Sequence, residues 1–253
     1  MPPILIALIV FAFVFGGALL GVWLRNALPE HHLSDESKDV VKLGMGLLAT
    51  LTALVLGLVT ASAKSAFDVQ DTAIKHMAVS VLGLDRTLAR YGPETHQIRE
   101  LLRSVLAFRL DATWPEDTSE AVRVETLETT PTVEGIEDSI RNLSPQTDAQ
   151  RAFQSRALAS TSDLLDMRWT VFGAVGSAIP TPFLVIVVFW LAVLFWSFGL
   201  FAPRNATVIT VLLLCAMSVA ASIFLILEME RPFDGIMKVS GAPYRYTLAH
   251  LGQ

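Results

Sequence analysis

Residues 43–63 read LGMGLLATLTALVLGLVTASA, a run without Asp, Glu, Lys or Arg that is bracketed by Lys42 and Lys64. A helix rises about 1.5 Å per residue, so roughly twenty apolar residues cross a hydrocarbon core about 30 Å thick. A charged side chain at the centre of such a helix costs roughly 2.5–3.5 kcal/mol on insertion scales. The absence of charge therefore predicts that this stretch crosses a membrane.

Three further runs have the same character: residues 3–24, 182–201 and 206–227. The chain of 253 residues is 53% hydrophobic and 17% charged, with a mean hydropathy of +0.52 that is typical of membrane proteins. The first run follows Met1-Pro2-Pro3, which lacks the basic residues of a signal peptide, so we expect an uncleaved, lipid-facing anchor. Only Ala202-Pro203-Arg204-Asn205 separates the last two runs, which predicts a helical hairpin with a structural turn.

The predicted fold is an all-α membrane protein with four transmembrane helices and a cytoplasmic helical bundle continuous with them. We expect residues 1–63 to hold helices 1 and 2 with an outer loop, residues 64–178 the helical domain, residues 179–229 the hairpin, and residues 230–253 a cytoplasmic C-terminal segment. Basic residues near the boundaries number seven on the side of the termini and four on the other. The seven are Lys64, Lys75, Arg156, Arg168, Arg231, Lys238 and Arg245, and the four are Arg25, Lys38, Lys42 and Arg204.

The segment after Lys64 continues the helical pattern. Its apolar residues occupy the a and d positions of one heptad frame, which predicts that the second crossing runs on as a long helix to Tyr91-Gly92-Pro93. A second helix is expected from Pro93, short helices around Val133–Ile140, and a third long helix after Leu143-Ser144-Pro145-Gln146. The residues of the first heptad frame are Phe67, Ile74, Met77, Val81, Leu84, Leu88 and Tyr91, broken by Gln70; those of the second helix are Ile98, Leu101, Val105, Phe108 and Ala112; those of the third are Phe153, Ala157, Leu164 and Met167.

One face of the second crossing carries only small or polar side chains, except for the lysine at its end. Successive members are three or four residues apart and therefore share one stripe of a helix. Two interpretations stay open: the stripe admits a neighbouring helix at close range, or it lines a water-filled path in an oligomer with lysines near both mouths. The members of this stripe are Gly46, Thr50, Ala53, Gly57, Thr60 and Lys64.

No catalytic motif of the nucleophile-elbow, P-loop or zincin kind occurs, so we predict that the protein is not an enzyme and has no cofactor. His31 and His32 do not complete a metal-binding spacing and are expected to be solvated loop residues. Cys215 lacks a second thiol. The net charge of −5 and the absence of a basic tract argue against nucleic acid as a partner.

Glu228, Arg231 and Pro232 follow the last crossing and are interpreted as residues of an interfacial turn. A carboxylate at a helix C-terminus opposes the helix dipole. We therefore expect a basic partner for Glu228, such as Arg231 or Lys64.

Several strings along the chain are distinctive when taken together. They are Leu54-Val55-Leu56-Gly57-Leu58-Val59, Ala61-Ser62-Ala63-Lys64-Ser65 with Phe67-Asp68, Ile179-Pro180-Thr181-Pro182-Phe183, Phe198-Gly199-Leu200-Phe201-Ala202-Pro203-Arg204-Asn205, and Leu225-Ile226-Leu227-Glu228 with Arg231-Pro232-Phe233. With these strings the chain resembles the bestrophin-like membrane proteins of bacteria over nearly its whole length. That resemblance implies oligomeric anion channels with four membrane helices per subunit and cytoplasmic ends. The aromatic-aliphatic neck of bestrophins is replaced here by Thr50, Gly57 and Thr60, and their acidic calcium cluster has no counterpart.

Together these features predict a homo-oligomeric ion channel or channel-like transporter of the bacterial inner membrane, with the second crossing along the path and anions as the hypothesis for the ion. The expected partners are the lipid bilayer, further copies of the chain (five if the protein is truly bestrophin-like) and small inorganic ions. The alternative is a non-conducting membrane scaffold or signalling subunit whose cytoplasmic bundle binds a partner.

Overall fold

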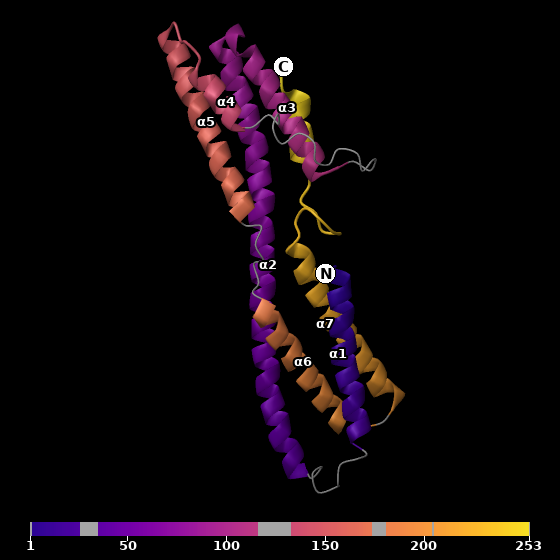
Figure 1. The fold of residues 1–253 in the computed structure, drawn as a ribbon. Helices are drawn as coiled ribbons and strands as arrows, with labels where there is room; N and C mark the ends of the chain where they lie inside the picture. Colours follow the sequence, from indigo (N-terminus) through magenta and orange to yellow (C-terminus); the bar gives the residue numbers. More distant parts are fainter. Residues whose placement is uncertain (1, 26–34, 116–132, 174–180, 204, 253) are drawn as a thin grey trace. The chain divides into compact units, whose positions relative to one another are not determined.

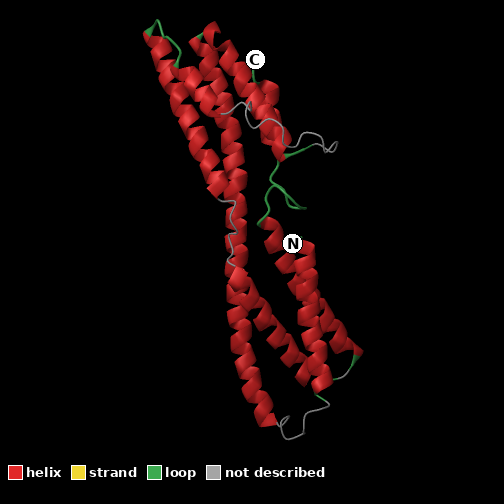
Figure 2. Cartoon of the chain, viewed as in Figure 1, coloured by secondary structure: helices red, strands yellow, loops and turns green. Residues whose placement is uncertain are grey.

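The computed structural model describes residues 2–25, 35–115, 133–173, 181–203 and 205–252 (Figure 1). All regular structure in these residues is helical, as Figure 2 shows, which confirms the predicted all-α class. His31, His32 and Arg204 lie outside the described residues. The helices are α1 (Pro3–Leu24), α2 (Asp35–Tyr91), the 3₁₀ turn η2 (Pro93–Thr95), α3 (His96–Thr113), α4 (Val133–Arg141), α5 (Asp148–Gly173), α6 (Thr181–Phe201), α7 (Ala206–Met229) and α8 (Ala242–His250).

The chain divides into two compact units. One, called here the membrane unit, comprises residues 1–67, 177–231 and 235–237; the other, called the bundle unit, comprises residues 68–176, 232–234 and 238–253. Four helices are long and apolar enough to cross a membrane, as predicted: Pro3–Leu24, Asp39–Tyr91, Pro182–Phe201 and Ala206–Met229. The protein is therefore a membrane protein with four candidate spans.

Within the membrane unit, α1 packs against both α6 and α7 (Figure 1). Its buried face includes Val10, Val14 and Ala18, which join a core built from α2, α6 and α7. The expectation that the first crossing is a simple lipid-facing anchor was thus wrong on one face. The opposite face is exposed in the protomer at Ile9, Phe13 and Leu20, as suits contact with lipid.

The closest helix packing in this unit is the contact of α1 with α6, which we call the seam. A Cβ atom on Gly21 would overlap the carbonyl oxygen of Trp196, and one on Gly199 would overlap that of Ala18. A Cβ atom on Gly17 would lie 3.3 Å from the carbonyl oxygen of Ala192. Without side chains at these positions the two backbones approach each other directly, as in small-xxx-small contacts of membrane helices.

The helix α2 continues without interruption for 57 residues, from Asp35 to Tyr91. The prediction of one long helix is confirmed, although it begins inside the stretch expected to be an outer loop. The helix ends where predicted: Gly92 has a φ of 142°, which only glycine adopts readily, and Pro93 opens η2.

The bundle unit packs the second half of α2 against α3, α4, α5 and α8. Ile74, Val81, Leu84, Leu88 and Tyr91 are buried along α2, as their spacing predicted. Ile136 and Ile140 of α4 and Ala157 and Leu164 of α5 complete this core, and Phe153 and Met167 lie half-buried.

The predicted inner face of α3 was partly wrong. Ile98 and Val105 are buried, but Phe108 is 43% exposed and Ala112 is exposed. Leu102, Leu106 and Leu110 are buried instead. The helix contacts α4 and α8 as well as its neighbours in sequence, so its buried face is wider and lies to one side of the heptad positions.

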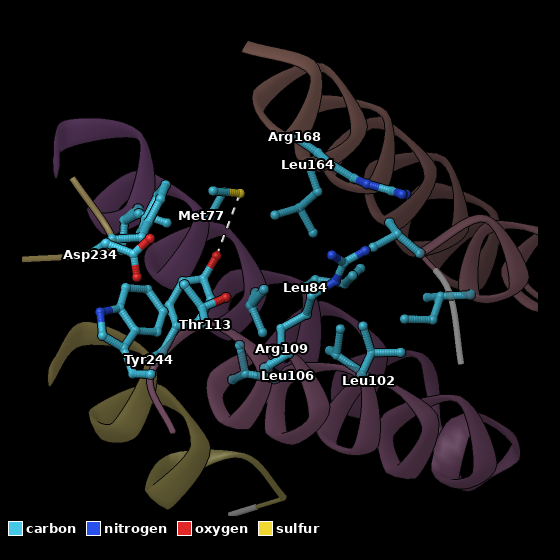
Figure 3. Close-up of a pocket in the computed structure, with 18 residues that line it drawn as sticks. Met77, Leu84, Leu102, Leu106, Arg109, Thr113, Leu164, Arg168, Asp234 and Tyr244 are labelled. Atoms are coloured by element: carbon cyan, nitrogen blue, oxygen red, sulfur yellow. Dashed lines mark hydrogen bonds between the residues drawn. The ribbon is translucent and has the colours of Figure 1, made fainter. Parts of the chain in front are cut away.

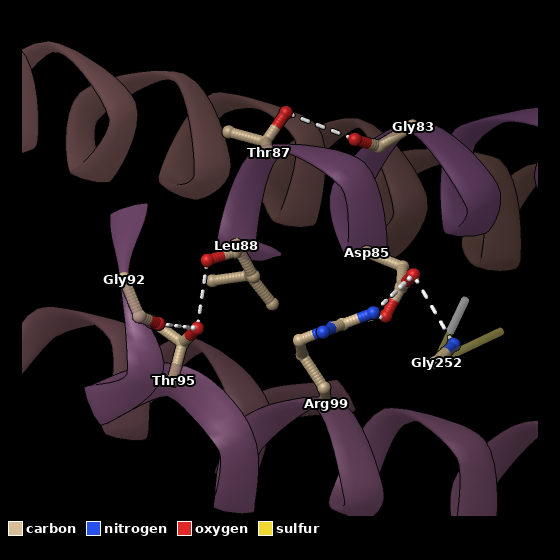
Figure 4. A network of polar contacts seen from close by, with 8 residues as sticks. All are labelled: Gly83, Asp85, Thr87, Leu88, Gly92, Thr95, Arg99 and Gly252. Carbon is tan, nitrogen blue, oxygen red and sulfur yellow. Dashed lines mark hydrogen bonds and ion pairs between the residues drawn. The ribbon is translucent and has the colours of Figure 1, made fainter. Parts of the chain in front are cut away.

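A polar network ties α2 to α3 inside the bundle unit (Figure 4). Asp85 is completely buried, and its two carboxylate oxygens accept hydrogen bonds from Arg99 Nε at 2.7 Å and Nη2 at 3.1 Å. The amide of Gly252 donates to the same carboxylate at 3.4 Å. This paired arrangement raises the pKa of Arg99, chiefly through the hydrogen bond to Asp85, and it fixes the C-terminal residues against α2.

Candidate functional site

The small stripe of α2 lies entirely on the exposed surface of the protomer. Each of its six members, Gly46, Thr50, Ala53, Gly57, Thr60 and Lys64, is exposed. A Cβ atom added to Gly46 or Gly57 would meet nothing within 4 Å. Among the described residues, no helix of the same chain therefore covers this stripe.

The packed face of α2 lies elsewhere on the helix. Thr52, Val59 and Ala63 are buried, and Val59 and Ala63 belong to the core shared with α1, α6 and α7. Met45 extends this face, since its sulfur lies 2.5 Å from the hydroxyl of Ser197 on α6. The helix is thus anchored on one side, which leaves the stripe open in the isolated subunit.

A row of leucines borders the stripe. Leu43, Leu47, Leu54 and Leu58 are between 65% and 77% exposed, and at about 100° per residue they lie roughly a quarter turn from the stripe. Side chains of this kind suit lipid or the apolar side of another subunit. The exposed surface of α2 therefore has two faces of different chemistry, one small and polar and one apolar.

The threonine hydroxyls of the stripe hydrogen-bond to their own helix. Thr50 Oγ1 donates to the carbonyl of Gly46 at 2.8 Å, and Thr60 Oγ1 donates to that of Leu56 at 2.7 Å. A hydroxyl has one donor and two acceptor lone pairs, so each oxygen keeps acceptor capacity toward its surroundings. These bonds let polar side chains exist in a membrane span at little cost, and the oxygens stay able to accept hydrogen bonds from water.

The lysines near the two ends of the stripe have different surroundings. Lys42 Nζ lies 3.1 Å from Asp39 Oδ1, with both side chains largely exposed. Lys64 Nζ lies 5.8 Å from the centre of the Phe67 ring, within the range of a cation–π contact. Lys42 therefore shares its end with a carboxylate one turn away, and Lys64 contacts an aromatic face.

The turn between α6 and α7 is built by capping interactions. Asn205 Oδ1 accepts a hydrogen bond from the amide of Val208 at 2.8 Å and so caps the N-terminus of α7. Pro203 precedes it, and the carbonyl of Pro203 accepts the amide of Asn205 at 3.0 Å. Arg25, at the end of α1, donates from Nη1 to the carbonyl of Ala202, a contact that sequence reasoning missed.

Glu228 is buried, but its partners are not the expected basic residues. Its Oε2 accepts hydrogen bonds from the backbone amides of Ile236 at 2.7 Å and Met237 at 3.4 Å. Gly235 has a φ of 94°, and a Cβ atom there would overlap the Glu228 carboxylate. Backbone amides therefore stabilise this carboxylate, and Glu228 fastens the chain that follows Arg231 and Pro232 back onto the end of α7.

Other residues that organise the protein have weaker signals in the sequence. Gly17, Gly21 and Gly199 mark the seam, and their spacing could have indicated a close helix contact, but nothing in the sequence says which helices meet. Asp85 directly follows the apolar core residue Leu84. A carboxylate at such a position can be buried if it has a basic partner, but the sequence does not show that the partner is Arg99.

Comparison with models of known protein families shows which family the chain belongs to. The profile of the bestrophin-like domain matches residues 12–244, which include three complete spans, part of the first span and most of the bundle unit.

The chain belongs to the bestrophin-like family.

This assignment confirms the resemblance found in the sequence, and with the four apolar spans it supports a channel-like membrane protein. No curated protein and no solved structure matches the chain significantly. Membership of the family therefore supports a membrane protein with four spans, and the evidence for an ion path in this bestrophin-like protein comes from its own residues.

Proposed function

We propose that this bestrophin-like protein is a homo-oligomeric ion channel or channel-like transporter, with α2 lining the path. The observation that carries the proposal is the uncovered stripe from Gly46 to Lys64. It combines two hydroxyls, three positions with little or no side chain and a terminal ammonium group. In a ring of subunits such a stripe facing the axis leaves space for water and offers polar groups to a passing ion.

The small share of α2 that its own subunit covers supports an oligomer. Only 11% of its most apolar stretch is buried in the protomer, compared with 39% for α6. A span that is least covered by its own chain is the one most available to neighbouring copies. In the proposed ring, the leucine row beside the stripe packs against the next subunit, and five subunits are expected if the number follows that of bestrophins.

Anions are the proposed ions. No Asp or Glu occurs between Asp39 and Asp68, so the stripe itself carries no negative charge. Lys64 adds positive charge at one end, and positive charge at a mouth raises the local concentration of anions. Each lysine also has a carboxylate one turn away, Asp39 beside Lys42 and Asp68 after Lys64, so the absence of negative charge along the stripe is the main support for anions.

The proposed location is the bacterial inner membrane, with both termini and residues 64–178 in the cytoplasm. The seven boundary lysines and arginines on that side, against four on the other, support this orientation. Reporter fusions at Glu134 and Asp35 test it: a periplasmic signal at Glu134 would reverse the topology.

The direct test of conduction uses the purified full-length protein in planar bilayers and in flux-loaded liposomes. We expect conductance with a reversal potential set by the chloride gradient, and we expect Gly57→Leu or Thr60→Leu to reduce it at least about tenfold, because a bulky apolar side chain dewets a narrow path. Gly44→Leu is the matched control, since Gly44 is also exposed, also open to 4 Å, and lies off the stripe.

Two results would contradict the proposal: no conductance for any small ion, or equal conductance in Gly57→Leu and Gly44→Leu. An oligomer whose stripes form a dry contact between subunits would instead favour the non-conducting scaffold. A reversal potential that follows the cation gradient would be consistent with a conducting path along α2 but would contradict the preference for anions.

A further inference from the structure

The bundle unit contains an open cavity of about 380 Å³ between α2, α3, α4, α5 and the residues around α8 (Figure 3). Its walls are mainly aliphatic, with Leu84 from α2, Leu106 from α3 and Leu164 from α5. This volume falls in the range of about 300–1,000 Å³ that is typical of small-molecule sites. The cavity lies within one unit of the chain and is separate from the stripe of α2.

Aromatic side chains form one end of the cavity. Trp114 contacts Tyr244 and Phe233 edge to face, with ring centres 5.6 and 6.0 Å apart. Trp114 Nε1 donates to the carbonyl of Val239 at 2.8 Å, and Tyr244 lies with its hydroxyl 3.6 Å from the sulfur of Met77. These contacts hold three rings in place, so the wall is ordered without a ligand.

Two arginines give the cavity its polarity. Arg168 from α5 is paired with Glu134 at 2.8 Å. Arg109 from α3 is half-buried and, among the described residues, makes no hydrogen bond or ion pair. Burial and then the nearby Arg168 lower the pKa of Arg109, against smaller opposing effects of Tyr244 and Glu134. The guanidinium therefore lies in a partly apolar site beside a second cation.

Few groups in the lining counter this positive charge. Asp234 is the acidic side chain among the described lining residues, and Figure 3 shows it on the opposite side of the view from Arg168. Burial raises the pKa of Tyr244 to about 12, so its hydroxyl is neutral at physiological pH. No carboxylate is hydrogen-bonded to the half-buried Arg109 among the described residues, and the nearby Glu134 is already paired with Arg168. A ligand that brings an anion would therefore offset the cost of burying this charge.

We propose that this cavity binds a compact amphiphilic anion, with its carboxylate on Arg109 and Arg168 and its apolar body against the leucines and the ring of Trp114. The planar guanidinium group of arginine matches the two oxygens of a carboxylate. The volume suits an apolar body of one or two rings or a medium-length chain. The anion comes either from solution or from a fatty acid of the surrounding bilayer, since both present a carboxylate on an apolar body.

The test uses the full-length protein in nanodiscs of phosphatidylcholine, with 2-naphthoate as the probe. Isothermal titration calorimetry, with empty nanodiscs as the reference, is expected to show saturable binding of one probe per protein chain. The neutral analogue 2-naphthamide is expected to bind at least about tenfold more weakly, because it cannot form charge-assisted bonds. Equal binding of the two compounds, or no saturable binding of 2-naphthoate, would overturn the proposal.

Variants assign the site to the cavity. Arg109→Gln is expected to weaken 2-naphthoate at least about tenfold, and Arg109→Lys to restore part of the affinity by keeping the charge. Arg103→Gln is the matched control, because Arg103 is an exposed arginine of the same helix outside the cavity. Unchanged affinity in Arg109→Gln, with the same thermal unfolding as the parent protein, would place the binding elsewhere and contradict the proposal.

The source of the anion is tested in the same nanodiscs. Laurate added to the bilayer that competes with 2-naphthoate in the parent protein would favour a membrane fatty acid as the occupant, and absence of competition would favour a soluble anion. Either result supports an anion site when the Arg109 variants respond as expected.

Discussion

The seam between α1 and α6 and the stripe of α2 are both lines of small residues in membrane spans, yet the structure treats them in opposite ways. At the seam, Cβ atoms on Gly21 or Gly199 would overlap backbone carbonyl oxygens of the facing helix. On the stripe, Cβ atoms on Gly46 or Gly57 would meet nothing within 4 Å. The same kind of sequence therefore closes one helix contact and leaves another face open.

This difference shows what small residues do and do not encode. Removing side chains makes a face that another backbone can approach, but the approach itself depends on what the rest of the chain brings there. The seam is covered by the same subunit, so its glycines support the fold. The stripe is uncovered in the subunit, so its residues are available to water, lipid or further copies of the chain.

The largest expected effect comes from filling the seam. Gly199→Leu should destabilise the membrane unit by about 3 kcal/mol, because its side chain would displace the backbone of α1 rather than a flexible side chain. Unfolding of the protein in detergent micelles, followed by circular dichroism, measures the change. Gly16→Leu is the control, since Gly16 lies on α1, the other helix of the seam, and a Cβ atom there would meet nothing within 4 Å. Similar losses of stability in both variants would show that close backbone contact at Gly199 is not the cause.

A second experiment asks whether the open face meets water. In a Cys215→Ser background, Thr60→Cys should react with a charged methanethiosulfonate reagent at least about tenfold faster than Leu58→Cys. The thiolate attacks the sulfur of the reagent and displaces sulfinate, and both the thiolate and the charged reagent require water. Leu58 is 68% exposed in the protomer, so exposure alone does not separate the two positions. Equal rates would mean that the stripe and the leucine row share one environment.

A third effect concerns the end of the seam. Arg25→Gln should cost about 1 kcal/mol of unfolding free energy, because it replaces a charge-assisted bond to the Ala202 carbonyl at a half-exposed site. Arg25→Lys keeps a charged donor and should recover part of the loss. The same denaturation experiment measures both variants, and no difference between them and the parent protein would show that the contact adds nothing.

Much of the fold could be predicted from the sequence because its signals are local. The four apolar runs, the continuation of α2 to Tyr91 and the helix end at Gly92 all depend on neighbouring residues along one helix. The inner face of α3 was predicted less well, since Leu102, Leu106 and Leu110 are buried by α4 and α8, which no local period reveals. The amide partners of Glu228 were missed because they depend on how the chain folds back after Pro232.

The spacing of the residues in the candidate site could be predicted from the sequence, but their surroundings in the folded protein could not. The stripe from Gly46 to Lys64 was identified from its spacing, and its exposure required the positions of α1, α6 and α7. The cavity around Arg109 had no signature in the sequence, because its walls come from five separate segments. Its arginines stand among other charged residues whose surroundings only the folded chain defines.

The smallest expected effect has the opposite sign to the first. Gly57→Ala should stabilise the isolated subunit by about 0.5 kcal/mol, since alanine favours a helix over glycine and its methyl group meets nothing on this face. Unfolding in micelles and native mass spectrometry of the oligomer measure the two consequences. If the stripe lines a hydrated path, the oligomer keeps its subunit number and the gain persists. If instead the stripe forms a dry contact between subunits, the added methyl group pushes them apart, and Gly57→Ala then weakens the oligomer as Gly199→Leu weakens the seam.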